Sequence, residues 1–193
     1  MDLQKEFWIK NMVCSRCIKV IKQELDVLNV TVLSLKLGQL IVKTNDEEDL
    51  EIDKKITERL LSNGFEIVQS EEKMLVEKIK IILIDQFTEL PIHLRVKTSE
   101  HLSSILNEDY KKISKLFSKN EETTIEKYFI KLKIEKVKEL IQLKQHTFSD
   151  IAYLLDYSSV NHLSRQFKEL VGMSMTDYKN ADSYKRSFYD EII

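Results

Sequence analysis

The sequence has 193 residues but only three glycines and one proline, so few residues favour tight turns. This scarcity predicts long helices. No apolar run approaches the ~20 residues that a membrane-spanning helix needs, and the chain does not start with a basic segment followed by an apolar stretch. We therefore expect a cytoplasmic protein that does not bind a membrane.

Cysteine is also scarce, with Cys14 and Cys17 as the two examples. In a cytoplasmic protein such a pair is expected to provide free thiols, metal ligands or a redox couple rather than a structural disulfide. The net charge is −2, so the charge balance gives no support to a nucleic-acid partner. The sequence also lacks a glycine-rich phosphate loop and a catalytic triad, so we expect no enzyme activity.

The first 70 residues alternate between extended and helical patterns. NVTVLSLKL and QLIVKT are β-branched runs separated by Gly38, which predicts a hairpin. Two other segments carry apolar residues at helical spacing: Ile18, Ile21 and Leu25, then Ile52, Ile56 and Leu60. Together with EFWIKNM at the start, where Phe7 and Ile9 share a side, and FEIV at the end, they predict the order β-α-β-β-α-β. Such a chain is expected to form an antiparallel four-stranded sheet covered by two helices.

From Glu71 onward the pattern is helical. The predicted helices are 72–88, 98–106, 109–119, 122–144, 148–155, 159–170 and 174–182. The short polar segment QSEEK separates the two halves. We therefore predict an α+β protein with a ferredoxin-like domain in 1–70 and an all-α domain with a long central linker helix in 71–182. Residues 183–193 form a C-terminal tail.

The helical half contains an internal repeat. Asn107 corresponds to Asp156 at an offset of 49 residues, and beyond this point the offset is 50, where Phe117 matches Phe167 and Tyr128 matches Tyr178. Each copy is predicted to be a helix-turn-helix. We predict that Asn107 and Asp156 lie in the two turns, since Asn and Asp tolerate the positive φ of a tight turn better than other non-glycine residues.

The second helix of each copy has an inner apolar stripe and an outer polar stripe. The inner stripes are Tyr110, Ile113 and Phe117 in the first copy, and Val160, Leu163 and Phe167 in the second. The outer stripes are Lys111, Ser114 and Lys115, and Asn161, Ser164, Arg165 and Lys168. One polar stripe on a surface helix is usually only solvated. Two in matching positions favour double-stranded DNA as the partner, because Arg pairs with guanine edges, Asn with adenine, and Lys with phosphate or guanine.

Several of these motifs resemble those of AraC-type transcription regulators. DIAYLLDYSSVNHLSRQFKELVGMSMTDYK resembles the C-terminal signature of that family, LSSILNEDYKKISKLFSKNEETTIEKYF its first helix-turn-helix, and KLKIEKVKELI its linker helix. Asn107, Asp156 and Glu122 stand where the family usually has glycine. The resemblance implies a double helix-turn-helix DNA-binding domain. It also implies base and backbone contacts at Lys111, Ser114, Lys115, Ser159, Asn161, Ser164, Arg165 and Lys168.

The motif MVCSRC lies where the first predicted strand meets the first predicted helix. With Cys14 in the loop and Cys17 in the opening helical turn, both sulfurs can converge on one ion. Two thiolates suit Cu(I) or Ag(I), or Zn(II) if other ligands join. Residues 5–69 resemble the heavy-metal-associated domain of copper chaperones and metal-pumping ATPases, with Asn11 and Val13 in place of the usual Gly and Thr. The resemblance implies a metal site at the two cysteines.

Three functional hypotheses remain open. In the first, the chain is a sequence-specific DNA-binding regulator modulated by a soft metal at the CxxC loop. In the second, it is a regulator whose N-terminal domain binds no ligand and instead mediates protein interaction or homodimerisation. In the third, it is a metal-delivery protein whose helical half docks a partner protein. A thiol redox switch is a further use of the cysteine pair.

Overall fold

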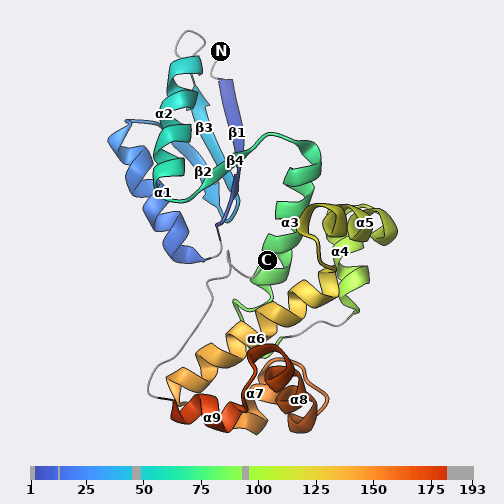
Figure 1. Cartoon of the computed structure of the whole chain (residues 1–193). Coiled ribbons are helices and arrows are strands. Elements are labelled where there is room, and N and C mark those ends of the chain that lie inside the picture. The colour runs from blue at the N-terminus through green and yellow to red at the C-terminus, as the bar shows by residue number, and fades with distance from the viewer. Residues whose placement is uncertain (1–2, 13, 45–48, 93–95, 182–193) are drawn as a thin grey trace. The chain divides into compact units, whose positions relative to one another are not determined.

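Strands and helices segregate along the chain, as the α+β prediction requires (Figure 1). The computed structural model describes residues 3–12, 14–44, 49–92 and 96–181, and the predicted tail 183–193 lies outside them. Contacts between residues divide the chain into two units, Met1–Ile81 and Ile82–Ile193. The first contains a four-stranded antiparallel sheet, and the described part of the second is helical.

The first unit begins with the predicted order of elements: β1 (Leu3–Lys10), α1 (Ser15–Val27), β2 (Val32–Lys36), β3 (Gln39–Thr44), α2 (Asp49–Ser62) and β4 (Glu66–Val68). The strand order in the sheet is β2-β3-β1-β4, and each neighbouring pair is antiparallel. In β1, Phe7 lies opposite Leu40 of β3, and Trp8 lies opposite Val68 of β4. The β2–β3 hairpin turns at Gly38, whose φ is 70°. This is the left-handed region that glycine adopts without strain.

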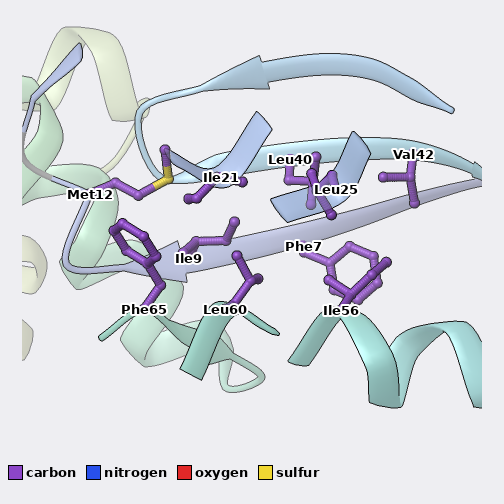
Figure 2. Packing of buried hydrophobic residues seen from close by; sticks show 10 residues of the cluster. All are labelled: Phe7, Ile9, Met12, Ile21, Leu25, Leu40, Val42, Ile56, Leu60 and Phe65. Atoms are coloured by element: carbon purple, nitrogen blue, oxygen red, sulfur yellow. The ribbon is translucent and has the colours of Figure 1, made fainter. Parts of the chain in front are cut away.

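The core of this unit lies between the sheet and the two helices α1 and α2 (Figure 2). Phe7 and Ile9 are both buried, as expected for alternate residues of β1 that face the same side. The helices contribute the other predicted core residues: Ile21 and Leu25 from α1, and Ile56 and Leu60 from α2, each no more than 1% exposed. Ile18 and Ile52 are partly buried against this cluster. The helical spacing seen in the sequence therefore identified the buried faces correctly.

Helix α3 (Glu71–Asp85) follows the sheet, and the division between the two units falls within it. The sequence prediction placed the boundary between residues 70 and 71, ahead of this helix. The difference has a packing cause, because the Lys78 ammonium lies 4.4 Å from the centre of the Trp8 ring. A Cβ added at Gly38 would also lie 2.1 Å from Cδ1 of Ile81. The first part of α3 thus packs on the sheet unit.

The second unit continues with α4 (Thr98–Leu106), α5 (Tyr110–Glu121), α6 (Ile125–Leu143), α7 (Phe148–Leu154), α8 (Val160–Val171) and α9 (Met175–Asn180). These ranges differ from the predicted helices by at most three residues at either end. The largest difference here is at the start of α6, which was expected at residue 122. Glu122 instead ends α5 with a φ of 52°, and the Thr124 hydroxyl caps α6 by accepting a hydrogen bond from the Lys127 N–H. Among the described residues, no helix combines the length and apolarity needed to cross a bilayer.

Candidate nucleic-acid interface

Each predicted helix-turn-helix is present as two helices joined by a short turn, α4 with α5 and α7 with α8. Both turns contain the residue predicted to tolerate a positive φ: Asn107 has a φ of 51°, and Asp156 has a φ of 56°. The second helix of each copy is then capped by a side chain. Asp109 accepts hydrogen bonds at the start of α5, and Ser159 accepts one at the start of α8. The repeat in the sequence is therefore a repeat of local structure.

Four of the six residues of the predicted inner stripes are buried, while Tyr110 and Val160 are half-buried. Ile113 and Phe117 of α5, and Leu163 and Phe167 of α8, have no exposed surface. Phe117 meets Tyr128 of α6 edge-to-face with ring centres 5.5 Å apart, and Phe167 meets Tyr178 of α9 at the same distance. Residues that are 50 positions apart therefore make equivalent contacts in the cores of the two copies. Each second helix is held by its apolar stripe, which leaves the opposite face free to meet a partner.

The outer stripes face solvent. Lys111 and Lys115 on α5 are exposed, while Asn161, Arg165 and Lys168 are exposed on α8. Two further members, Ser114 and Ser164, are half-buried. Within the residues that the structure describes, none of these side chains forms a hydrogen bond or an ion pair. Their polar groups are therefore available to a partner without first breaking an internal contact.

Ser159 differs from the other predicted contact residues because its side chain already has a structural role. Its hydroxyl oxygen accepts a hydrogen bond from the His162 N–H at 3.1 Å and so caps α8. The residue is exposed, and its hydroxyl hydrogen can still be donated outward. Capping and a contact with a phosphate oxygen are therefore compatible at this position.

The starts of the two exposed helices differ in charge. At α5 the cap is the carboxylate of Asp109, and the adjacent Glu108 accepts a hydrogen bond from the Lys112 ammonium at 2.7 Å. At α8 the equivalent positions are Ser158 and Ser159, which are neutral. Carboxylates stabilise a helix N-terminus, but they also repel a phosphate that approaches it. The start of α8 is therefore the better suited of the two to lie beside a phosphate backbone.

Helix α6 lies between the two helix-turn-helix copies within the second unit (Figure 1). It contacts α5 of the first copy, and it also contacts α7, α8 and the following α9. Its 19 residues correspond to a length of ~28 Å at a rise of 1.5 Å per residue. Successive major-groove faces of a duplex are ~34 Å apart. The length of α6 is therefore close to one turn of duplex DNA.

Tyr157, in the turn of the second copy, interacts with Lys133 of α6, a contact that no pattern in the sequence had predicted. Burial raises the pKa of the Tyr157 hydroxyl, which donates a hydrogen bond to Gln166 of α8 at 2.6 Å. The Lys133 ammonium lies 5.1 Å from the centre of the Tyr157 ring, and burial lowers the pKa of this lysine while the nearby Asp156 opposes the change. A lysine in a helical pattern is ordinarily assigned to solvent. Its spacing of four residues from the buried Phe129 was the one available signal.

The two cysteines lie at the start of α1, as predicted. Their sulfurs are 3.7 Å apart, which is too long for a disulfide bond of about 2.05 Å. Two sulfurs each ~2.3 Å from a tetrahedral zinc ion would lie ~3.8 Å apart, so the observed spacing is compatible with shared coordination. Among the described residues, no group of three or more His, Cys, Asp or Glu side chains is placed to hold a metal. The two thiols are thus the described side chains at this position that could bind a metal, and two thiolates suit a soft ion.

The residues around the cysteine loop occupy structural positions. Asn11 has a φ of 71°, and its side-chain amide donates a hydrogen bond to the Gly64 carbonyl at 2.9 Å. A positive φ is a conformation that Asn tolerates better than most other non-glycine residues. Met12 is buried, and its sulfur accepts a hydrogen bond from the Gly38 N–H at 3.3 Å. Its side chain belongs to the core.

Comparison with known proteins supports the identification of the C-terminal region. Residues 102–181 match the profile of a family described as "Helix-turn-helix domain". The "Probable transcriptional regulator LumQ" of Photobacterium leiognathi is 27% identical over 152 residues, which cover 76% of this chain and 61% of LumQ. The chain thus spans about three-fifths of the length of that relative.

A solved structure is similar in fold to part of this chain. The C-terminal domain of AraT, a response regulator from Geobacillus stearothermophilus, has a TM-score of 0.50 and 18% sequence identity, and the match covers 62% of this chain and 97% of that domain. This likeness shows a shared fold, and the family match supports an AraC-type helix-turn-helix domain in the C-terminal region. The predicted resemblance to a helix-turn-helix domain is confirmed over residues 102–181. LumQ is described as a probable transcriptional regulator. The resemblance of residues 5–69 to a heavy-metal-associated domain stays a prediction.

Proposed function

We propose that this chain is a transcription regulator that binds double-stranded DNA, with α5 and α8 each entering a major groove. One observation carries the proposal. The second helix of each helix-turn-helix copy presents exposed polar and basic side chains at equivalent positions on two repeated scaffolds, and these side chains have no hydrogen-bond or ion-pair partner among the described residues. A merely solvated face would not be expected to recur with the same chemistry at the same positions.

The side chains divide into two kinds of contact. Arg165 and Asn161 on α8 have the donor and acceptor geometry to read guanine and adenine edges. Lys111 and Lys115 on α5, with Lys168 on α8, supply point charges that suit phosphate oxygens and fix the register of the protein on the duplex. Short hydroxyls, those of Ser114, Ser159 and Ser164, are suited to backbone contacts. Sequence preference should therefore reside mainly in α8.

The proposal is tested by selecting binding sites from a random DNA library with the purified chain and measuring affinity for the selected site. Arg165→Ala should weaken binding by ~1–3 kcal/mol and relax the preference at one base pair. Lys111→Ala should weaken selected and random DNA alike and reduce the slope of affinity against salt by about 1. Lys22→Ala is the matched control, because it removes one charge from an exposed position on α1. Failure to select any sequence, or unchanged binding by Arg165→Ala, would contradict the proposal.

We further propose that residues 1–70 are a ferredoxin-like domain that binds a soft metal ion, Cu(I), Ag(I) or Zn(II), through Cys14 and Cys17. Two observations support this second role. The order β-α-β-β-α-β with strands arranged β2-β3-β1-β4 is the topology expected of such a domain. The two thiols also lie 3.7 Å apart at the start of α1.

A titration of the selected DNA with and without Cu(I) or Zn(II) tests the metal role. If the metal modulates regulation, it should shift the DNA affinity of the wild-type chain and leave the double variant Cys14→Ser with Cys17→Ser unchanged. A chain that binds no metal but associates as a homodimer would favour an interaction module instead. Transfer of Cu(I) to an acceptor protein, together with no DNA binding, would favour a metal-delivery protein.

A further inference from the structure

The turn of the second helix-turn-helix is one residue longer than that of the first. In the first copy, one residue separates Asn107, which has the positive φ, from the capping Asp109. In the second copy, two residues separate Asp156 from the capping Ser159, and the first of them is Tyr157. This insertion accounts for the change of offset from 49 to 50 residues. It places an aromatic side chain in the second turn at a point where the first turn has none.

Tyr157 connects the turn to α8 on one side and to α6 on the other. Its hydroxyl donates a hydrogen bond to Oε1 of Gln166 at 2.6 Å, and its ring meets the His162 ring edge-to-face with centres 5.4 Å apart. Both partners lie on α8, one helical turn from each other. On the side of α6, the ammonium of Lys133 lies 5.1 Å from the centre of the Tyr157 ring and 5.3 Å from that of Phe129. Lys133 is therefore placed between one ring of α6 and one ring of the second turn.

The contacts continue toward the segment between α3 and α4. Phe129 packs against Phe87, with ring centres 5.6 Å apart. The N–H of Ile92 in the same segment donates a hydrogen bond to the carbonyl of Leu154 at 2.8 Å. That carbonyl lies in the last turn of α7, where helices leave acceptors unsatisfied. The turn of the second copy therefore contacts α8 and α6, and the end of α7 that precedes it is hydrogen-bonded to the segment between α3 and α4.

The first copy has no such arrangement at the equivalent positions. At an offset of 50, His162 corresponds to Lys112 and Gln166 corresponds to Leu116. Lys112 forms an ion pair with Glu108 in its own turn, and both residues belong to the same copy. The aromatic and cationic contacts are therefore a property of the second copy alone within the described residues.

We propose that Lys133 and Tyr157 are positioning residues that fix α8 relative to α6 and thereby set the spacing between the two DNA half-sites that the chain accepts. The inference rests on the proposed DNA-binding function. Two contacts on α8 one turn apart constrain the rotation of that helix about its own axis. The contact with Lys133 ties this constraint to the helix that also carries the first copy. The fixed direction of the outer stripe of α8 then determines where the second groove must lie.

The DNA experiment compares affinity for a selected two-part site with affinity for the same site after insertion of one base pair between its halves. One base pair shifts the second half by ~3.4 Å and rotates it by ~35°. The wild-type chain should lose affinity strongly on insertion. Lys133→Met keeps the aliphatic length and removes the charge, and Tyr157→Leu removes the ring. In both variants the loss on insertion should be smaller than in the wild type by a factor of about three or more, as expected when a contact of cation–π strength is removed.

The control is Lys136→Met, the same substitution on the same helix at a lysine that pairs with Glu139 of α6 at 2.8 Å. It should keep the wild-type spacing preference. If Lys133→Met and Tyr157→Leu weaken binding to both sites by the same factor, the spacing role is wrong, because a purely structural defect would act in this way.

A second measurement needs no DNA and separates this inference from the proposed function. Residual dipolar couplings of α6 and α8 in the wild-type chain should fit one alignment tensor, because the two helices are fixed relative to each other. In Lys133→Met the couplings should require two tensors, one for each helix. Couplings that fit one common tensor in the variant would overturn the positioning role even if DNA binding is established. If the wild-type chain selects no DNA but the variant separates the two tensors, the positioning role stands and the proposed function fails.

Discussion

The two equivalent ring pairs of the helical unit should show equal energetic coupling. Phe167 has no exposed surface, and its ring lies 5.5 Å from that of Tyr178 at an interplanar angle of 73°. Phe117 and Tyr128 show the same distance with an angle of 63°. Edge-to-face pairs of this geometry contribute ~0.5–1.5 kcal/mol beyond the burial of their surface. We therefore expect a coupling energy in this range for both pairs.

A double-mutant cycle measures the coupling. The first cycle combines Phe167→Leu with Tyr178→Leu, the second combines Phe117→Leu with Tyr128→Leu, and urea unfolding is followed by far-ultraviolet circular dichroism. Each single Phe→Leu change should cost less than the ~3–5 kcal/mol of a full truncation to alanine, so the variants should stay folded. Since distant sites add within ~0.3–0.5 kcal/mol, a coupling smaller than this in either cycle would refute the packing described for that copy.

Three further predictions concern backbone and capping positions. Gly38→Ala should lower the free energy of unfolding by ~1–2 kcal/mol, because a residue with a side chain is strained at a φ of 70° and would contact Ile81, and urea denaturation measures the loss. Glu122→Gly should raise the free energy of unfolding by up to ~1 kcal/mol, because glycine relieves the strain at a φ of 52° and this gain exceeds its larger loss of entropy on folding. A lower midpoint of urea denaturation in this variant would contradict the reasoning. Hydrogen bonds from Thr147 lower the pKa of Asp150, so this carboxylate stabilises the fold above its ordinary pKa of 3.8 and loses that effect as the pH falls through the lowered value. Melting curves recorded between pH 2 and pH 6 should show an acid-dependent loss that Thr147→Ala reduces.

Local features of the sequence predicted most of the helical unit. The positive φ of Asn107 and Asp156 follows from the residue types that tolerate it, and the buried stripes follow from helical periodicity. The start of α6 was placed three residues too early. The pattern of apolar residues continues across the end of α5, whereas the break depends on the backbone of Glu122 and the hydroxyl of Thr124.

Contacts between distant residues were not accessible from local patterns. Lys133 and Tyr157 are 24 positions apart, and no periodicity relates a lysine within one helix to a tyrosine in a later turn. The same holds for the packing of Ile81 against Gly38, which brings the first part of α3 onto the sheet unit. The outer stripes were predicted as surface residues, and all of their members are exposed except the half-buried Ser114 and Ser164. Their role toward DNA stays a prediction, because exposure alone does not specify a partner.

Helix α6 belongs to the hydrophobic cores of both helix-turn-helix copies, and ten of its 19 residues are buried. Neither copy can therefore lose this helix without exposing the apolar side chains of the other. Deuterium exchange at the amides in the middle of α6 should require opening of the whole helical unit and should be the slowest in that unit. A single proteolytic cut within α6 should unfold both copies together, so that neither fragment retains a folded helix-turn-helix.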